Sequence, residues 1–450
     1  MNTFDVFDTL LARRYLTNNA LLQQMETEFS IPGLALARTQ ADTGTRSLAE
    51  IYDHLVATGI IPARLRRTIL KREIELEIDN VFPVAQNLQR VAHGDILISD
   101  MYLPASAILQ MVRSVGLDKQ VTLYQSNADK HTGAVWKKFR HYSGVHLGDN
   151  KHSDYTMPVQ AGINAEHFSP ATEPTGIEAS LVNNGFIHIG LLSREIRLSS
   201  IPKFKDHFEL ACDFNLPLLF IMAEMIHRQY GERNIVFLGR DCQLLHRLYN
   251  AYYDLSYYLP FSRKVAYNQP EDAVKYLYTH APENPLFVDI SSTGGTWAKL
   301  QSDIDILVAI YSDKTYYTPD RPVLPKNFKY LTTSNEIGAT NLMLEIMNCG
   351  DHGHLESIQI HQDQLLEAHF ALPELPAELI SEVHLPVSRA VQLAKFYKQN
   401  IRKEMAKLSD RQLVQGLSQL AGFICSRQDL LQSHQTLLSK ESVYIAQICQ

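Results

Sequence analysis

Short apolar segments alternate with helical segments along this chain, and this alternation limits its possible folds more than any other feature. In the first third, apolar runs of strand length occur at Thr3–Phe7, Asp95–Ser99, Val121–Ser126 and Val145–Asp149. Between about residues 17 and 90, apolar residues recur instead at the three- and four-residue spacing of amphipathic helices. Strands that alternate with helices pair in parallel, because each return needs a crossover connection. The sequence therefore predicts an α/β fold with a Rossmann-like parallel sheet.

A second α/β pattern follows the first. The chain has 450 residues, more than one ordinary core holds, so we expect two domains. The segment Ser169–Gly176 is rich in Pro and Thr and marks the start of a linker. Further strands are expected at Asn234–Gly239, Pro285–Ile290 and Asp305–Asp313, and the pattern is helical from Pro386 onward. We predict an α/β domain at 1–175 with a helical insert at about 12–90, a second α/β domain at 176–385, and a helical segment at 386–450.

Composition and charge exclude several classes of protein. Hydrophobic residues make up 45% of the chain and charged residues 20%, as in soluble globular proteins. A net charge of −7 argues against a protein that coats nucleic acid or anionic membranes. The chain starts without a signal-like segment, and its longest apolar stretch, Leu216–Ile226, is too short to span a bilayer and indicates a buried helix. The five cysteines show no CxxC spacing. We expect a cytoplasmic protein with no membrane or nucleic-acid partner; its oligomeric state is left open.

Four short motifs occur in order at the C-terminal ends of the first predicted strands. They are FDVFDTLL at Phe4–Leu11, ILISD at Ile96–Asp100, Lys130 within NADKHTG, and HLGDNKHSD at His146–Asp154. Ligands of parallel sheets bind at these strand ends, so the motifs can converge on one site. Over about residues 1–170 the chain resembles the HAD (haloacid dehalogenase-like) superfamily, specifically the predicted hydrolases that carry FDxFDTLL and SDMYLP.

The resemblance implies phosphoryl transfer through a carboxylate nucleophile. Asp5 matches the nucleophile, which splits the reaction into two steps through an aspartyl phosphate. Thr9 would steady the loop, and Ser99 would hydrogen-bond a phosphoryl oxygen. Lys130 would neutralise charge on the nucleophile and on the transferring group.

The same resemblance implies a Mg²⁺ site. Its ligands would be Asp5, the carbonyl group of Phe7, Asp149 and Asp154, which together offer the hard oxygen atoms that Mg²⁺ prefers. The expected substrate is a small phosphorylated metabolite, such as a sugar phosphate or a nucleotide.

One position departs from the pattern of typical HAD phosphatases. Two residues after the nucleophile they carry an Asp that protonates the leaving group, and here that residue is Phe7. A carboxylate follows at Asp8, which is a candidate for the acid, although an Asp in such a loop most often caps or braces the turn. The sequence thus allows a phosphatase, a phosphotransferase with a good leaving group, a dehalogenase-like hydrolase, or a catalytically degenerate binding or regulatory protein. The paired acids Asp149 and Asp154 favour a metal and hence phosphoryl chemistry.

The helical insert lies where many HAD enzymes carry a cap domain. A cap excludes water and contacts the substrate. Tyr52, Glu73 and Glu77 are candidates for specificity, but we favour the interpretation that they form the polar face of a helical bundle.

The second domain carries a phosphate-loop pattern. The segment Leu286–Leu300 predicts a strand, a Gly/Thr/Ser loop and a helix start, where backbone N–H groups hold phosphate well. It resembles the PRPP loop of type I phosphoribosyltransferases, roughly DDxxxTGxT. Asp289 matches the first acid, which holds ribose hydroxyls, whereas Ile290 replaces the second. The predicted phosphate-binding loop residues are Thr293, Gly294, Gly295 and Thr296.

Three further residues of this domain are candidates for binding. Arg240, in the strand–loop–helix segment Phe237–Tyr249, would be the cation of a pyrophosphate loop. Glu345 matches a later Glu that accompanies FDxFDTLL domains. Arg263 would bind phosphate or pair with a carboxylate, and surface pairing is the commoner outcome. We expect a phosphoribosyltransferase-like domain that binds a phosphorylated sugar or nucleotide, or one that has lost transferase activity.

Overall fold

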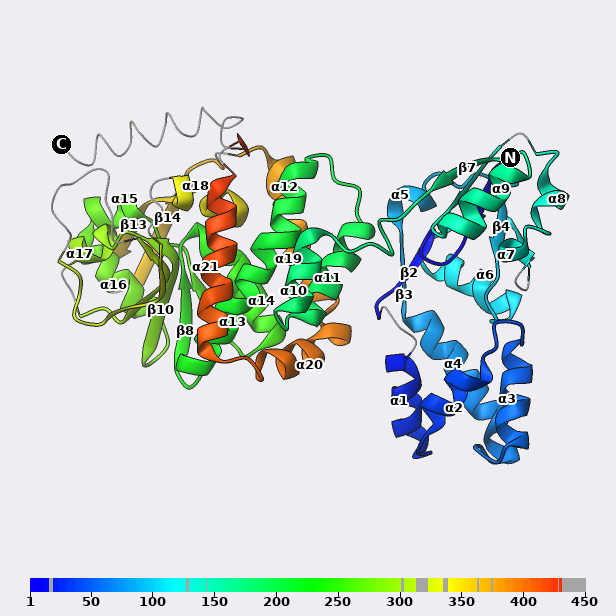
Figure 1. Cartoon of the computed structure of the whole chain (residues 1–450). Helices are drawn as coiled ribbons and strands as arrows, with labels where there is room; N and C mark the ends of the chain where they lie inside the picture. The colour runs from blue at the N-terminus through cyan, green and yellow to red at the C-terminus, as the bar shows by residue number, and fades with distance from the viewer. Residues whose placement is uncertain are drawn as a thin grey trace. The chain divides into compact units, whose positions relative to one another are not determined.

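The chain folds into two compact units. The computed structural model describes residues 1–15, 19–126, 129–142, 144–300, 303–312, 323–334, 339–361, 364–373, 375–427 and 429–430 (Figure 1). The first unit comprises Met1–Gly176 with Arg197–Ile201, and the second comprises Ile177–Ile196 with the described part of Pro202–Gln450. Each unit has its own hydrophobic core.

The first unit is built on a five-stranded parallel sheet in the order β5-β4-β1-β6-β7. Its strands are β1 (Thr3–Asp5), β4 (Ile96–Ser99), β5 (Thr122–Gln125), β6 (Val145–Gly148) and β7 (Asn164–His167). The chain winds from β1 through β4 to β5 on one side and then returns to β6 and β7 on the other. The predicted α/β class with parallel sheets is therefore confirmed. The winding reverses between β1 and β6, which is where ligands of such sheets bind.

Helices cover both faces of this sheet, and alternating strand residues point to opposite sides. Leu97 shares a core with Ile108 and Met111 of α6 (Ala105–Ser114). Ile96 and Ile98 belong to a separate cluster with Trp136 and Phe139, at the two ends of α8 (Trp136–Phe139). Such two-sided burial explains why the strands are continuous apolar runs in the sequence.

The predicted helical insert is present, with an addition that the sequence did not predict. Its helices are α1 (Asn19–Phe29), α2 (Leu34–Ala41), α3 (Leu48–Ala57), the short 3-10 helix Ala63–Leu65 and α4 (Arg66–Asp79). A two-stranded antiparallel ribbon, β2 (Leu11–Arg13) and β3 (Val81–Pro83), joins the insert to the sheet and is followed by α5 (Ala85–Leu88). Figure 1 shows α1 to α4 as a group beyond this ribbon. Ser47 and Glu50 form a capping box that fixes the start of α3.

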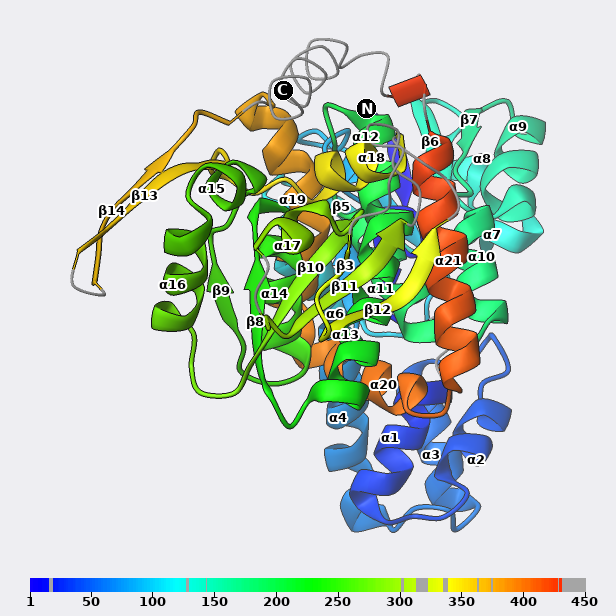
Figure 2. The same ribbon diagram turned by 90° about the vertical axis from the view of Figure 1, so that its left-hand side faces the viewer.

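The second unit has its own five-stranded parallel sheet, in the order β12-β11-β10-β8-β9 (Figure 2). Its strands are β8 (Asn234–Leu238), β9 (Tyr257–Leu259), β10 (Pro285–Ser292), β11 (Ile306–Ser312) and β12 (Phe328–Ser334). Here the winding reverses between β8 and β10, as in other doubly wound folds with this order. A separate antiparallel pair, β13 (Leu355–His361) and β14 (Gln364–Phe370), was not predicted.

Helices cover the second sheet on both faces as well. They are α10 (Gly176–Asn183), α11 (Ile187–Leu198), α12 (Lys205–Leu210), a π-helical turn (Ala211–Asn215), α13 (Leu216–Tyr230), a 3-10 turn (Arg240–Cys242), α14 (Gln243–Tyr252), α15 (Arg263–Asn268), α16 (Pro270–His280), α17 (Gly295–Leu300), α18 (Ala339–Asn348), α19 (Ala377–Gln392), α20 (Ala394–Met405) and α21 (Asp410–Ser426). On one face, α13, α14 and α18 to α21 share the main core. On the other, α15, α16 and α17 pack with β13.

The C-terminal helices are part of the second unit. The predicted boundary at residue 386 falls inside α19, where Pro386 is an interior residue. Leu413 and Leu417 of α21 lie in the same core as α13. At Gly416, a Cβ atom would lie 3.1 Å from Cδ1 of Ile221, so the absence of a side chain lets α21 approach α13 closely. Residues 431–450 of the predicted helical segment lie outside the described residues.

The apolar stretch Leu216–Ile226 is a buried helix, as predicted. Within the described residues, one continuous helical stretch, Lys205–Tyr230, is long and apolar enough to cross a membrane, and 89% of its most apolar window is buried inside the protein. Core helices of soluble proteins have the same property, so this stretch is weak evidence for a membrane segment.

Candidate active sites

The end of β1 brings together the residues predicted for catalysis in the first unit. Asp5 is the last residue of β1 and is 7% exposed. Thr9 donates a hydrogen bond from Oγ1 to Oδ2 of Asp5 at 3.1 Å. Lys130 lies in α7 (Asp129–Thr132), and its Nζ is 2.5 Å from Oδ1 of Asp5 and 2.6 Å from Oδ1 of Asp154. One buried ammonium group therefore bridges two buried carboxylates.

Burial and this bridge set the ionisation of Asp5 and Lys130. Burial raises the pKa of Asp5 to about 7, although Lys130 acts to lower it. Burial also acts to lower the pKa of Lys130, but the attraction of Asp5 and Asp154 outweighs it, and this pKa is raised. The lysine is thus charged at neutral pH, and ionisation of Asp5 depends on positive charge nearby.

Asp154 is fixed by several partners. It lies in a π-helical turn (Lys151–Thr156) whose start is capped by Asn150. Its Oδ1 also contacts Nε2 of His146 at 3.2 Å, and its Oδ2 accepts a hydrogen bond from the backbone N–H of Asn150 at 3.2 Å. Burial would raise the pKa of Asp154, but His146 and Lys130 lower it. A Cβ atom at Gly148 would lie 2.5 Å from Cγ of Asp154, so only glycine fits there.

Asp149 follows β6 directly and has a different environment. Among the described residues, its carboxylate has no hydrogen-bonding or ion-pairing partner. Burial, followed by the repulsion of Asp5, Asp154 and Asp8, raises its pKa to about 8. Carboxylate oxygens of Asp5, Asp149 and Asp154 all lie within 4.8 Å of one another. The three carboxylates carry more negative charge than Lys130 alone can neutralise, and their oxygen atoms are ligands of the kind that Mg²⁺ prefers. Mg²⁺ itself, and the carbonyl of Phe7 as a further ligand, stay predictions.

Phe7 lies two residues after Asp5, at the position where the resemblance described above leads one to expect an acid. Its ring is 8% exposed, and the guanidinium carbon of Arg13 lies 4.7 Å from the ring centre. Asp8 adopts a left-handed backbone conformation with φ of 55°, which costs a non-glycine residue roughly 1 kcal/mol. Its charge affects both Asp149 and Arg13. Asp8 is therefore near the site, on the turn that follows Asp5.

Ser99 and Asp100 end the neighbouring strand β4. Ser99 is 1% exposed, and its Oγ accepts a hydrogen bond from the backbone N–H of Met101 at 3.3 Å, which leaves its own proton to donate. Oδ1 of Asp100 is buried and has no partner within the described part of the chain. Burial raises the pKa of Asp100, against the effect of Lys130. Asp100 ends the quoted ILISD motif, but the sequence analysis gave it no role and did not predict its place beside Lys130.

The interpretation of Tyr52, Glu73 and Glu77 as a polar bundle face is wrong, because all three are buried. Glu73 pairs with Arg38 at 2.7 Å and accepts a hydrogen bond from the hydroxyl of Tyr52 at 2.6 Å. Glu77 pairs with Arg13 at 3.1 Å. These acids are internal counter-ions, and Glu77 connects α4 to the arginine that covers Phe7.

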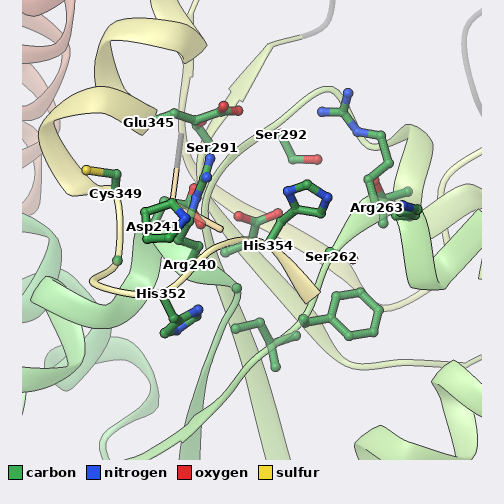
Figure 3. Close-up of a pocket in the computed structure, with 18 of the residues that line it drawn as sticks. Arg240, Asp241, Ser262, Arg263, Ser291, Ser292, Glu345, Cys349, His352 and His354 are labelled. Atoms are coloured by element: carbon green, nitrogen blue, oxygen red, sulfur yellow. The ribbon is translucent and has the colours of Figure 1, made fainter. Parts of the chain in front are cut away.

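The second unit holds a cavity of about 450 Å³ at the point where its sheet changes winding direction (Figure 3). Asp241, after β8, and Asp289, in β10, both line it, as does Glu345 of α18. Burial and Glu345 raise the pKa of Asp241 to about 7, and burial raises that of Asp289 well above its usual range. Asp289 accepts a hydrogen bond from Nε1 of Trp297 at 3.3 Å. No ion pair within the described residues neutralises these three acids.

The predicted phosphate loop is shorter than the sequence suggested. β10 continues through Ser292, so only Thr293 and Gly294 separate it from α17. Among the predicted loop residues, Thr296 lines the cavity, whereas Thr293, Gly294 and Gly295 are not among its lining residues. A Cβ atom at Gly294 would lie 2.3 Å from Cδ2 of Leu324, so this glycine is needed for close packing.

The predicted cations reach the same cavity. Arg240 follows Gly239, whose φ of 77° suits glycine, and lines the cavity together with Arg263. Arg263 has no hydrogen-bonding or ion-pairing partner among the described residues, so the expected surface pair is not observed there. Asp241 and Trp297 also line the cavity; both belong to segments that the sequence analysis singled out, but no role was predicted for them. His352 and His354 line it as well, and they lie outside those segments.

Comparison with known proteins adds no family. No protein-family model matches the chain, and no curated protein is significantly similar to it. The functional conclusions therefore depend on the geometry of the two sites.

Proposed function

We propose that the first unit is a Mg²⁺-dependent phosphohydrolase or phosphotransferase of the HAD type that acts through Asp5. The observation that supports this most strongly is Lys130, whose Nζ lies within 2.6 Å of both Asp5 and Asp154. The carboxylate of Asp149 belongs to the same cluster and has no partner in the part of the chain that the structure describes. A buried cation next to a carboxylate nucleophile is what transfer of an anionic phosphoryl group requires.

The reaction has two steps in this proposal. A carboxylate oxygen of Asp5 attacks phosphorus while the bond from phosphorus to the leaving oxygen breaks, which gives an aspartyl phosphate. Water or an acceptor hydroxyl then attacks the same phosphorus and frees Asp5. Lys130 balances charge on the transferring group, and Ser99 donates its hydroxyl proton to a phosphoryl oxygen.

Asp5, Asp149 and Asp154 would hold the metal ion, which supplies charge neutralisation at the phosphoryl oxygens when bound. Asp154 also orients Lys130 through their 2.6 Å contact. The protein thus positions the nucleophile and its counter-charge before substrate arrives.

The leaving group decides which substrates suit this site. Phe7 has no proton to give, and its ring is covered by Arg13. Small metabolites with good leaving groups, such as acyl phosphates, need no acid there, whereas sugar phosphates need Asp8 or solvent to protonate the leaving oxygen. We propose that good leaving groups react fastest.

The test is phosphate release from phosphorylated sugars, nucleotides and acyl phosphates, with and without Mg²⁺. The matched control is Asp5→Asn, which keeps the size of the side chain. Mg²⁺-dependent release that falls by roughly 10³-fold or more in the variant supports the proposal. Release that is unchanged in the variant would remove Asp5 from the mechanism.

Phe7 also motivates the alternative functions. A binding or regulatory protein would bind a phosphorylated ligand with Mg²⁺ but show no turnover. A dehalogenase-like hydrolase would release halide from a haloacid without added metal. For the second unit, binding of a phosphorylated sugar or nucleotide is supported by Asp289 and Arg240 in one cavity, whereas the short loop before α17 speaks against a transferase that depends on that loop.

A further inference from the structure

We infer that the cavity of the second unit is a separate site for a divalent cation, held by Asp241 and Asp289, together with an anionic phosphorylated ligand whose charged group is held by Arg263. This inference is independent of the function proposed for Asp5. It differs from the phosphate-loop interpretation, because the residues that carry it come after β8, from β10 and from the start of α15.

The position of the two acids is the first argument. β8 and β10 are neighbours in the sheet, and the chain leaves them in opposite directions. Carboxylate oxygens of Asp241 and Asp289 lie within 4.8 Å of each other. The thiol of Cys242 is equally near, but its Sγ donates to the carbonyl of Val288 at 3.4 Å and is fully buried, so the carboxylates are the available ligands.

An unsatisfied hydroxyl group in the lining of the cavity is the second argument. The hydroxyl oxygen of Ser291 is shielded from solvent and has no hydrogen-bonding partner in the described part of the chain. Ser291 and Asp289 are two residues apart in β10, and both line the cavity. A buried hydroxyl without a partner is costly unless a ligand or water completes it.

The charge of the lining is the third argument, and Figure 3 shows Asp241, Glu345 and Arg263 around the cavity. Asp289 adds a third acid, and Arg240 adds a second cation. Arg263 has no ion pair within the described residues, so its charge is available to a ligand. Lys264 beside it is already paired with Glu356 at 3.1 Å. A ligand that joins a metal ion to a phosphoryl group matches both kinds of charge, because the metal neutralises the acids and a guanidinium binds phosphate.

Terbium luminescence tests the cation site. Tb³⁺ takes oxygen ligands and is sensitised by a nearby indole, and the indole of Trp297 contacts Asp289.

The experiment uses the full chain with Asp5→Asn and Asp149→Asn, which removes two carboxylates from the first site. We expect saturable emission in this background, competition by Mg²⁺, and affinity weakened by about 10-fold or more when Asp241→Asn or Asp289→Asn is added. Asp303→Asn, an exposed acid of the same unit, is the matched control.

Near-ultraviolet circular dichroism of each variant shows whether it folds. Absence of emission in the folded background protein would overturn the inference. Emission that persists in both folded cavity variants would do the same, since the ion would then bind elsewhere. If one variant fails to fold, the other alone decides the outcome.

Pyrophosphate with Mn²⁺ tests the anionic half of the site. In the same background, we expect inorganic pyrophosphate to increase Mn²⁺ binding, measured from the free-ion paramagnetic resonance signal. Arg263→Gln should abolish this increase without weakening the binding of Mn²⁺ alone, because it removes a positive charge that acts on Asp241 and Asp289. An increase that survives in Arg263→Gln would exclude Arg263 as the phosphate contact. A loss of Mn²⁺ binding without pyrophosphate would contradict the division of roles between the acids and the arginine.

Discussion

The two units place acidic side chains at the same position in their sheets but balance the charge differently. In the first, Asp5 ends β1, the strand at which the winding direction changes, and buried Lys130 lies directly against it. In the second, Asp241 lies in the turn after β8 and Asp289 lies within β10, beside the corresponding change of direction, and neither has an ion pair within the described residues. In the function we propose, the built-in lysine orients Asp5 before substrate binds, whereas acids without an ion pair in a cavity suit a ligand that brings its own positive charge.

The largest expected effect comes from removing the built-in cation. Lys130→Ala leaves Asp5 and Asp154 buried without their shared partner, so we expect the unfolding free energy to fall by about 3–5 kcal/mol. Activity through Asp5 should fall with it. Chemical denaturation at neutral pH measures the change, and part of the loss should be recovered at lower pH as the carboxylates protonate. A change below about 1 kcal/mol would mean that the bridge is not a structural element.

The next effect is the pH dependence of the metal-free protein. The raised pKa values of Asp5, about 7, and Asp149, about 8, mean that the folded state binds these protons more tightly than the unfolded state. Their contribution to stability is therefore greatest at low pH and declines as the pH rises from about 4 to about 8. Unfolding in a chelator should show this decline, and Mg²⁺ should flatten it. Asp149→Asn should reduce both the decline of stability with pH and its flattening by Mg²⁺. A pH profile identical to that of the unmodified protein would exclude Asp149 as a source of the pH dependence.

A smaller effect concerns Asp8. Asp8→Gly removes the left-handed strain and should stabilise the protein by roughly 1 kcal/mol. If Asp8 protonates the leaving group, turnover of a sugar phosphate should fall while turnover of an acyl phosphate is kept. Asp8→Asn is the control that keeps side-chain size. Equal losses for both substrates would assign Asp8 to shaping the turn.

The smallest effect is expected in the second unit. Arg263 is exposed and has no partner in the described residues, so Arg263→Gln should change the unfolding free energy by less than about 0.5 kcal/mol. The same denaturation experiment as for Lys130→Ala measures it. A destabilisation as large as that of Lys130→Ala would show that Arg263 is structural and would remove the contrast between the two sites.

The sequence predicted the central strands well and the edge strands poorly. β1, β4, β6, β8, β10 and β11 are buried apolar runs, which the sequence shows directly. Within the two five-stranded sheets, the missed strands β7, β9 and β12 are edge strands, whereas the fourth edge strand, β5, was predicted. The antiparallel pairs β2–β3 and β13–β14 were missed as well. In β7, for example, three of four residues are exposed, so no apolar run marks it.

The candidate sites also divide into residues that the sequence predicted and residues that it missed. Asp5, Thr9 and Lys130 carry a motif and meet in space, as the sequence predicted. Buried ion pairs such as Arg38 with Glu73 were missed, because a charged residue in a helix pattern normally indicates a solvent-exposed face. The cavity of the second unit was only partly predicted, since Arg263, Glu345 and His352 reach it from segments far apart in the chain.

Identification of the covalent intermediate tests the central claim most directly. The protein is quenched during turnover of a reactive phosphorylated compound with Mg²⁺ and reduced with borohydride, which converts an aspartyl phosphate into homoserine, and the modified position is read by peptide mass spectrometry. We predict homoserine at position 5 and none in Asp5→Asn. Turnover without modification at position 5, or modification at Asp241 or Asp289 instead, would contradict the assignment of Asp5 as the nucleophile.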